Sequence, residues 1–345
     1  MLEAAQEVLA GEEAWIVGGA MRDELLGRPV VDLDIACREP EQAARRYARR
    51  SGGAPFPLSE RHGAWRVALP EDRTVDFTPL PNGIHDDLAT RDFTINAIAR
   101  PLAGGEPLDP FGGVGDLERR TLRAVVPGVF RDDPLRLLRA ARLESELGFR
   151  LDAETERLVR ASAGLVTRPA GERILAELER LGADGFERLE ELGLLAPLGG
   201  SVDRLRELGE TTVELRLVAV FGERLGQLPV SNELRRYAGK LLRAQLPADL
   251  SPRELHRFRR ATEPWATDAA RFAGGDAELE RAIETARAND PTHPLVRGDE
   301  LGLPPGPEIG EWLERIAEER AAGTISTREE ALELVQRGRP AGTDS

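Results

Sequence analysis

Apolar and polar positions alternate in short runs along the first hundred residues. Strand-like runs of period two, or short apolar runs, are found at 14–17, 30–36, 65–69 and 74–77. Helical spacing of apolar residues is found at 3–10, 21–26 and 41–50. This mixture predicts a small α/β region in which strands and helices share one core.

Strand signals fade after about residue 126, and helical periods dominate from Asp132 onward, interrupted by glycine and proline. We therefore predict an α+β fold, with a small mixed sheet followed by all-helical regions. The predicted parts are a head (1–125), a helical neck (126–182), a helical body (183–262), a helical tail (263–337) and a frayed C-terminus (338–345).

Composition indicates an ordinary globular protein. Hydrophobic residues make up 41% of the chain, charged residues make up 31%, and no apolar run is long enough for a membrane helix. The N-terminus is acidic and lacks the order of a signal peptide. The single cysteine, Cys37, excludes an internal disulfide and a cysteine-rich metal site. We expect a cytoplasmic protein with no membrane partner.

The net charge of −14 argues at first sight against a nucleic-acid partner, because phosphate binding needs positive charge. However, Lys240 is the single lysine, so 46 of the 47 basic residues are arginine. Arginine makes planar, bidentate contacts with phosphates and bases. Since a genome biased toward arginine codons gives the same excess, composition leaves the partner open.

Two carboxylates in one predicted strand are the first candidate for chemistry. Asp32 and Asp34 are separated by one residue, so they point to the same face of the strand. Oxygen ligands of this kind suit Mg²⁺, and such ions support phosphoryl transfer. Asp76, on a neighbouring predicted strand, is the candidate third catalytic carboxylate. The alternative is an ordinary solvated strand face.

A glycine pair precedes these carboxylates. Gly18 and Gly19 lie between a predicted strand and a predicted helix, and Arg22 follows within the first turn. Glycines there let backbone N–H groups approach phosphates, and a helix N-terminus favours anions. The segment predicts a triphosphate site, although a glycine pair alone is usually a simple turn.

A third candidate lies at the start of the predicted neck. Asp133, Arg136, Arg139 and Arg142 follow at steps of three residues and so share one side of a helix. A carboxylate can accept a hydrogen bond from the amino group of cytosine or adenine while a neighbouring guanidinium donates one to the ring nitrogen. Uracil and guanine present a carbonyl and a ring N–H, which is the reverse order. The alternative is a salt-bridged helix face exposed to solvent.

With these segments the chain resembles the class II tRNA nucleotidyltransferase and poly(A) polymerase family, within the DNA polymerase β-like nucleotidyltransferase superfamily. The segments that carry the resemblance are Gly18–Asp23, Leu26–Arg28, Asp32–Ala36, Arg91–Ala97, Asp132–Arg139, Gly171–Leu178, and Val296–Leu301 with Pro305–Gly310.

The resemblance implies a function. It is the template-independent addition of C or A nucleotides to the 3′ end of tRNA from CTP and ATP, with release of pyrophosphate and with Mg²⁺ as cofactor. It also implies roles for single residues: Asp32 and Asp34 as metal ligands, Gly19 and Arg22 at the triphosphate, Arg91 and Asp92 at the sugar, Asp133 and Arg136 at the base, and Arg139 and Arg142 in the same pocket.

Two alternatives stay open. One is a poly(A) polymerase, which shares every motif of the head. The other is a non-catalytic RNA-binding relative, against which the intact pair Asp32 and Asp34 argues. The chain departs from the family at Thr90, where a second arginine is usual, and at Asp132, where glutamate is usual.

The segment 77–90 is shorter than its family counterpart, which carries a flexible loop needed for the switch from C to A addition. Pro79, Pro81, Asn82 and Gly83 predict a tight turn there. We therefore hypothesise a form that adds C residues and leaves the terminal A to another protein. The alternative is that 85–87 and their neighbours suffice for full CCA addition.

Overall fold

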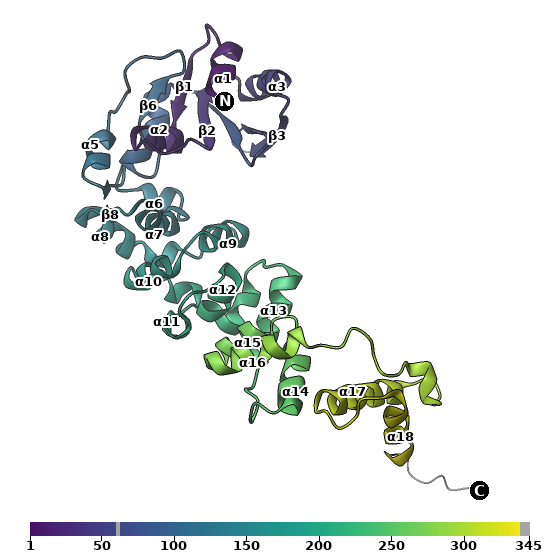
Figure 1. Ribbon diagram of the computed structural model, residues 1–345. Coiled ribbons are helices and arrows are strands. Elements are labelled where there is room, and N and C mark those ends of the chain that lie inside the picture. The colour runs from purple at the N-terminus through teal and green to yellow at the C-terminus, as the bar shows by residue number, and fades with distance from the viewer. Residues whose placement is uncertain (60–62, 339–345) are drawn as a thin grey trace. The chain divides into compact units, whose positions relative to one another are not determined.

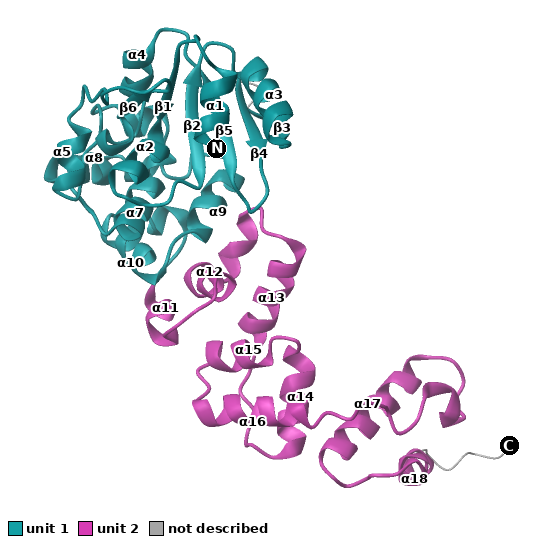
Figure 2. Cartoon of the chain, turned by 45° about the horizontal axis from the view of Figure 1, so that its top comes forward, with its two compact units in different colours: residues 1–201 teal, residues 202–345 magenta. Residues whose placement is uncertain are grey.

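The computed structural model describes residues 1–59 and 63–338. The chain divides into two compact units, residues 1–201 and 202–345 (Figures 1 and 2). In the described part of the chain, no helix has both the length and the apolar character needed to cross a membrane. The boundaries at 125, 182 and 262 stay predictions. The frayed C-terminus falls on residues outside the described part, apart from Gly338, which ends a helix.

The first unit is built around a six-stranded sheet with the order β3-β4-β5-β2-β1-β6. β2 pairs with β5 in parallel, and the other neighbouring pairs are antiparallel. The strands are β1 (Ala14–Val17), β2 (Asp32–Cys37), β3 (Ala54–Ser59), β4 (Ala64–Ala68), β5 (Thr74–Pro79) and β6 (Ala99–Pro101).

The four strands predicted from periodicity are confirmed, whereas β3 and β6 were not predicted. Pro55 and Pro57 argue against a strand because proline cannot donate to the ladder. β3 tolerates them because it lies at the edge of the sheet, where one side of the strand has no neighbour.

Helix α3 (Pro40–Ser51) covers one face of this sheet. Tyr47 of α3 packs against Phe77 of β5, with ring centroids 5.7 Å apart, and the Arg45 guanidinium lies 4.9 Å from the centroid of Trp65 in β4. Helix α1 (Leu2–Val8) packs beside α3. Since side chains alternate along a strand, the neighbours of Phe77 and Trp65, namely Asp76 and Arg66, point to the other face.

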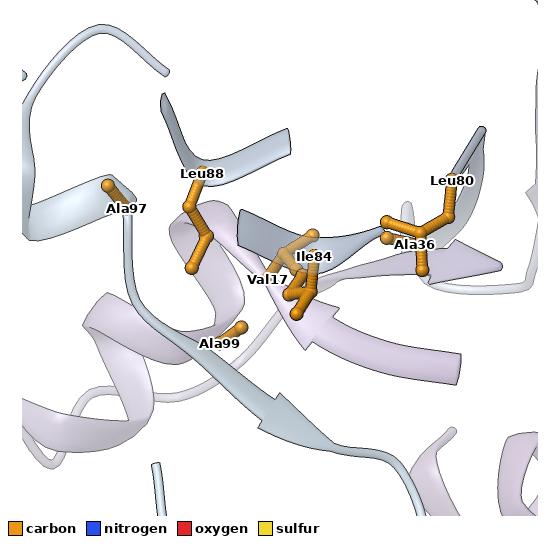
Figure 3. Close-up of a cluster of buried hydrophobic side chains, with 7 residues drawn as sticks. All are labelled: Val17, Ala36, Leu80, Ile84, Leu88, Ala97 and Ala99. Atoms are coloured by element: carbon orange, nitrogen blue, oxygen red, sulfur yellow. The ribbon is translucent and has the colours of Figure 1, made fainter. Parts of the chain in front are cut away.

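A buried cluster fixes one end of the sheet to the segment that follows β5 (Figure 3). The tight turn predicted for this segment is only its beginning, because helix α4 (Ile84–Ala89) follows Gly83, whose φ is +86°. The cluster joins α4 to β1, β2 and β6 through Val17, Ala36, Leu80, Ile84, Leu88, Ala97 and Ala99.

The rest of the first unit consists of helices and a two-stranded sheet. β1 ends at Val17, as predicted, but α2 begins at Gly18 rather than at residue 21. β8 adds a short strand within the neck, parallel to β7. The elements are α2 (Gly18–Leu25), α5 (Gly113–Glu118), β7 (Thr121–Leu122), α6 (Val129–Asp132), α7 (Arg136–Leu147), β8 (Arg150–Leu151), α8 (Ala153–Ala161), α9 (Gly171–Glu179) and α10 (Ala183–Glu191).

The second unit is helical throughout its described part, which confirms the α+β class with the sheet at the N-terminus. Trp312, Ile316 and Val335 belong to the core of its last helices. Ion pairs Arg253–Glu319, Arg257–Glu318 and Arg260–Glu314 join α14 to α17. The helices are α11 (Asp203–Leu208), α12 (Val213–Phe221), α13 (Asn232–Arg243), α14 (Pro252–Thr262), α15 (Ala266–Phe272), α16 (Ala277–Ala288), α17 (Pro307–Ala321) and α18 (Arg328–Gly338).

Candidate active site

One cavity of about 640 Å³ in the first unit brings together every residue singled out from the sequence. Its walls come from the start of α2, the strands β2 and β5, the segment around Arg91 and the start of α7. The predicted residues in its lining are Gly18, Gly19, Arg22, Asp32, Asp34, Asp76, Arg91, Asp92, Asp133, Arg136, Arg139 and Arg142.

The glycine pair packs directly against a carboxylate. Gly18 has a φ of +66°, and a Cβ added to it would lie 3.0 Å from Oδ2 of Asp34. The Gly19 N–H donates a hydrogen bond to the Asp34 carboxylate. A side chain at Gly18 would therefore be strained and would crowd Asp34 as well.

Asp34 and Asp76 are direct neighbours across the parallel pair β2/β5, and Asp32 is opposite Thr74. Oγ1 of Thr74 donates to Oδ1 of Asp32 at 2.7 Å. Arg66 donates to both oxygens of Asp76, each at 2.7 Å. Within residues 1–59 and 63–338, no three His, Cys, Asp or Glu side chains are placed to hold one metal ion together. Asp76 as a third catalytic carboxylate stays a prediction.

The Asp34 carboxyl has an unusual affinity for its proton. Burial raises its pKa from 3.8 to about 6, and the nearby carboxylates of Asp76 and Asp32 add to this effect, while Arg91 and the Gly19 N–H oppose it. The site thus concentrates negative charge that the protein itself does not fully neutralise.

A chain of hydrogen bonds links the start of α2 to the neck. Arg22, which is buried, donates from Nη1 to Oδ1 of Asn96 at 3.0 Å. Nδ2 of Asn96 donates to Oδ1 of Asp92 at 2.9 Å, and Nε of Arg139 donates to Oδ2 of Asp92 at 2.8 Å. Burial works against the ionised Asp92, yet Arg139, Asn96 and the Phe93 N–H lower its pKa to about 2. Asp92 is therefore an anion that holds two walls of the cavity together.

Arg91 lies between two carboxylates of the head. Its Nη2 donates to Oδ2 of Asp87 at 2.7 Å, and its guanidinium opposes the rise in the pKa of Asp34. Helix α4 provides Asp87, so the position of Arg91 depends on the packing of the segment 84–89.

The neck residues make contacts that differ from the predicted arrangement. Asp133 precedes α7 in extended backbone, so it does not share the helix face of the arginines. Its Oδ2 accepts from Arg173 of α9 at 2.8 Å. Nη2 of Arg136 donates to the Thr90 carbonyl at 2.6 Å. Arg142 is 4% exposed and pairs with Glu177 at 2.7 Å. The arginines of α7 therefore contact carboxylates and a carbonyl of other segments of the first unit.

The sequence of this chain is similar to proteins of a known family. The model of the poly A polymerase head domain matches residues 14–80 and 71–123. The A-adding tRNA nucleotidyltransferase of Deinococcus radiodurans is 36% identical, over 94% of this chain and 95% of that protein. The CC-adding tRNA nucleotidyltransferase of Thermus thermophilus is 31% identical, over 93% of this chain and 92% of that protein. The chain belongs to the class II tRNA nucleotidyltransferase family.

The fold agrees with that membership. The Thermotoga maritima CCA-adding enzyme, in a complex with tRNA, superimposes with a TM-score of 0.74 at 24% identity, over 97% of this chain and 93% of that chain. A complex of a CCA-adding enzyme with ATP gives a TM-score of 0.80 at 23% identity.

Among the cavity residues that were not predicted, Arg66, Asn96 and Arg173 form hydrogen bonds with predicted ones. The sequence carried a signal for all three. Arg66 alternates with apolar residues in a predicted strand, whereas Asn96 and Arg173 lie in the segments 91–97 and 171–178 that carry the family resemblance. The contact of Arg173 with Asp133 was not predictable, because it joins segments 40 residues apart.

The charge at Asp34 predicts a cost in stability. We expect Asp34→Asn to raise the free energy of unfolding of the metal-free protein by about 1–2 kcal/mol at pH 8, allowing for the partial exposure of the site. Because the folded pKa is raised, wild type should lose stability as the pH rises from about 4 to 6, and the variant should not. Urea denaturation between pH 4 and 8 measures this difference, and equal pH dependence of the two proteins would contradict it.

Proposed function

We propose that this protein adds C or A nucleotides to the 3′ end of tRNA without a nucleic-acid template, using CTP or ATP and releasing pyrophosphate. The observation that carries the proposal is the single cavity in which a carboxylate pair, a glycine turn at a helix start and the neck arginines meet. Family membership supports the same reaction.

The carboxylate pair fits Mg²⁺. Asp32 is exposed, Asp34 carries uncompensated negative charge, and both present hard oxygen ligands on one strand face. We propose that these two side chains hold the ion. When bound, Mg²⁺ would lower the pKa of the attacking hydroxyl and stabilise negative charge on the phosphates.

The protein's own groups would orient the nucleotide. The start of α2 and Arg22 would hold the triphosphate, because backbone N–H groups and a guanidinium attract its charge there. Arg22 is itself fixed by Asp23 and Asn96, so it needs little rearrangement. Asp133 would accept the amino group of C or A, with Arg173 fixing the carboxylate and Arg136 available to donate to the ring nitrogen.

Base choice should depend on Asp133. We expect Asp133→Ala to raise incorporation of UTP and GTP relative to CTP and ATP about tenfold, because one good bidentate base contact discriminates by about 1–3 kcal/mol. Competition between labelled nucleotides measures the ratio. Glu179→Ala, an exposed carboxylate of α9 outside the cavity, is the matched control. Unchanged selectivity in both variants would show that Asp133 does not select the base and that the neck contacts are structural.

Whether the enzyme adds C alone or both C and A is a more specific part of the proposal. We propose the form that adds C and leaves the terminal A to another enzyme. The proposal is supported by helix α4, because its residues Ile84 and Leu88 are buried in the cluster of Figure 3. The segment 84–89 is therefore packed in place and does not provide a flexible loop that could reshape the pocket. A tRNA ending in CC, incubated with ATP alone, tests this. No extension is expected, and efficient addition of one A would refute the C-only form.

The broader reaction has its own test. We propose to incubate the enzyme with tRNA transcripts that lack one, two or three 3′ nucleotides and to supply each nucleoside triphosphate separately. Extension confined to C or A, and dependent on Mg²⁺, is expected. A long A tract would identify a poly(A) polymerase, and no extension by an enzyme that still binds tRNA would identify a non-catalytic relative.

A further inference from the structure

One row of side chains crosses four strands on the open face of the sheet. Phe56 of β3 is opposite Arg66 of β4, Arg66 is opposite Asp76 of β5, and Asp76 is opposite Asp34 of β2. Residues directly opposite one another in a sheet share a face. Phe56 therefore lies on the catalytic face, at the end of the row that is remote from the start of α2.

Phe56 is exposed although it is a large aromatic residue. Its exposed fraction is 42%, and that of Leu58 in the same strand is 45%. The partly exposed Trp65 in the adjacent strand points to the other face, where Arg45 of α3 stacks on it. No aromatic stacking or cation–π partner of Phe56 is found among the described residues. The ring is thus available to a partner outside the chain.

The geometry of phosphoryl transfer indicates which substrate group lies at the Phe56 end of the row. In phosphoryl transfer the attacking and leaving oxygens are roughly in line on opposite sides of the phosphorus. The triphosphate would lie against the start of α2 and Arg22, so the leaving pyrophosphate is on that side of Asp34. The attacking 3′-hydroxyl must then approach from the opposite side, over Asp76, Arg66 and Phe56.

We propose that Phe56 is a stacking platform for the terminal base of the acceptor RNA. This inference rests on the proposed function and adds the place of the second substrate. Arg66 is held by Asp76 through two hydrogen bonds, so the aromatic ring beside it is the group free to hold a base. Stacking accepts any base, as an enzyme requires when its acceptor ends in different nucleotides at successive steps.

A second cavity continues this path away from the carboxylates. It has a volume of about 1220 Å³ and shares Asp133, Arg136 and Arg173 with the first cavity. Leu58 lines it, and so do Arg131 and Arg168, which form no ion pair or hydrogen bond with any side chain in the described part of the chain. In a chain whose arginines are mostly paired with carboxylates, these two are free for the phosphates of the preceding nucleotides.

The test is a series of substitutions at Phe56. Phe56→Ala and Phe56→Leu are expected to raise the KM for tRNA about tenfold or more, since base stacking on an aromatic residue contributes that much by alanine substitution. Phe56→Trp should keep the wild-type value, whereas the KM for CTP should stay unchanged in all three. Leu25→Ala, a residue of α2 with 41% exposure, is the control for loss of an exposed apolar side chain.

The outcomes separate this inference from the proposed function. Affinity for a labelled tRNA, measured by filter binding without nucleotide, should fall in Phe56→Ala and recover in Phe56→Trp. If wild type extends tRNA but Phe56→Ala matches it in KM and binding, the platform is refuted and the function stands. A change of oligomeric state in Phe56→Ala with unchanged tRNA binding would instead make β3 a protein interface. If wild type extends no tRNA, the proposed function itself fails.

Discussion

Replacing Asp34 with alanine is expected to reduce nucleotide transfer by at least about a thousandfold, with Mg²⁺ present and the fold intact. A required metal ion contributes several kcal/mol to stabilising the transition state, and each 1.4 kcal/mol is a factor of ten in rate. Asp34 lies against Gly18 at the start of α2 and is opposite Asp76 of β5. Asp32→Ala should have a similar effect.

The measurement is the rate of incorporation of labelled CMP into a tRNA lacking its last three nucleotides. Asp86→Ala is the matched control, because Asp86 is exposed on α4 and does not line the cavity. Circular dichroism and thermal denaturation check that each variant is folded. Activity of Asp34→Ala within about tenfold of wild type would refute the role of Asp34 as a Mg²⁺ ligand.

The second large effect is expected at Asp92. Asp92→Ala should lower the free energy of unfolding by about 3 kcal/mol and the rate of transfer by about a hundredfold. The loss leaves Arg139 without its carboxylate and the Phe93 N–H without its acceptor, and unsatisfied buried groups carry costs of this size. The rate falls because Asn96 and, through it, Arg22 lose their support, and misplaced groups at a reacting centre slow the reaction.

The pH dependence distinguishes a charge effect from a simple loss of packing. Because the pKa of Asp92 in the folded protein is lowered to about 2, its contribution to stability is present above about pH 4 and is lost as the pH falls toward 2. Asp92→Asn keeps the shape without the charge. Wild type should therefore lose its advantage in stability over Asp92→Asn between pH 4 and 2, and a constant difference across that range would show that the charge of Asp92 does not stabilise the fold.

Local periodicity was enough to predict much of the head. The strands β1, β2, β4 and β5 follow from alternation, because one face of each strand is covered and the other is not. The placing of Asp32 and Asp34 on one face follows from the same period. The β2/β5 register that puts Asp76 beside Asp34 could not be read from periodicity, since pairing joins segments 42 residues apart.

The contacts of the neck were harder to predict. Helical spacing placed Arg136, Arg139 and Arg142 on one side of a helix, but it said nothing about their partners. Those partners come from two other segments of the first unit, Thr90 and Asp92 from the segment around Arg91 and Glu177 from α9. Asp133 lies outside the helix because Pro134 disfavours helical backbone in the residue before it.

The most direct test of template-independent addition of C is the sequence of the product. A tRNA transcript without its last three nucleotides should be incubated with the enzyme, Mg²⁺ and all four nucleoside triphosphates, and its new 3′ end should be sequenced. We expect products that end after two added C residues, and none when Mg²⁺ is omitted. A product ending in a long A tract, a mixture of all four bases, or an unchanged transcript would contradict tRNA-specific, template-independent addition.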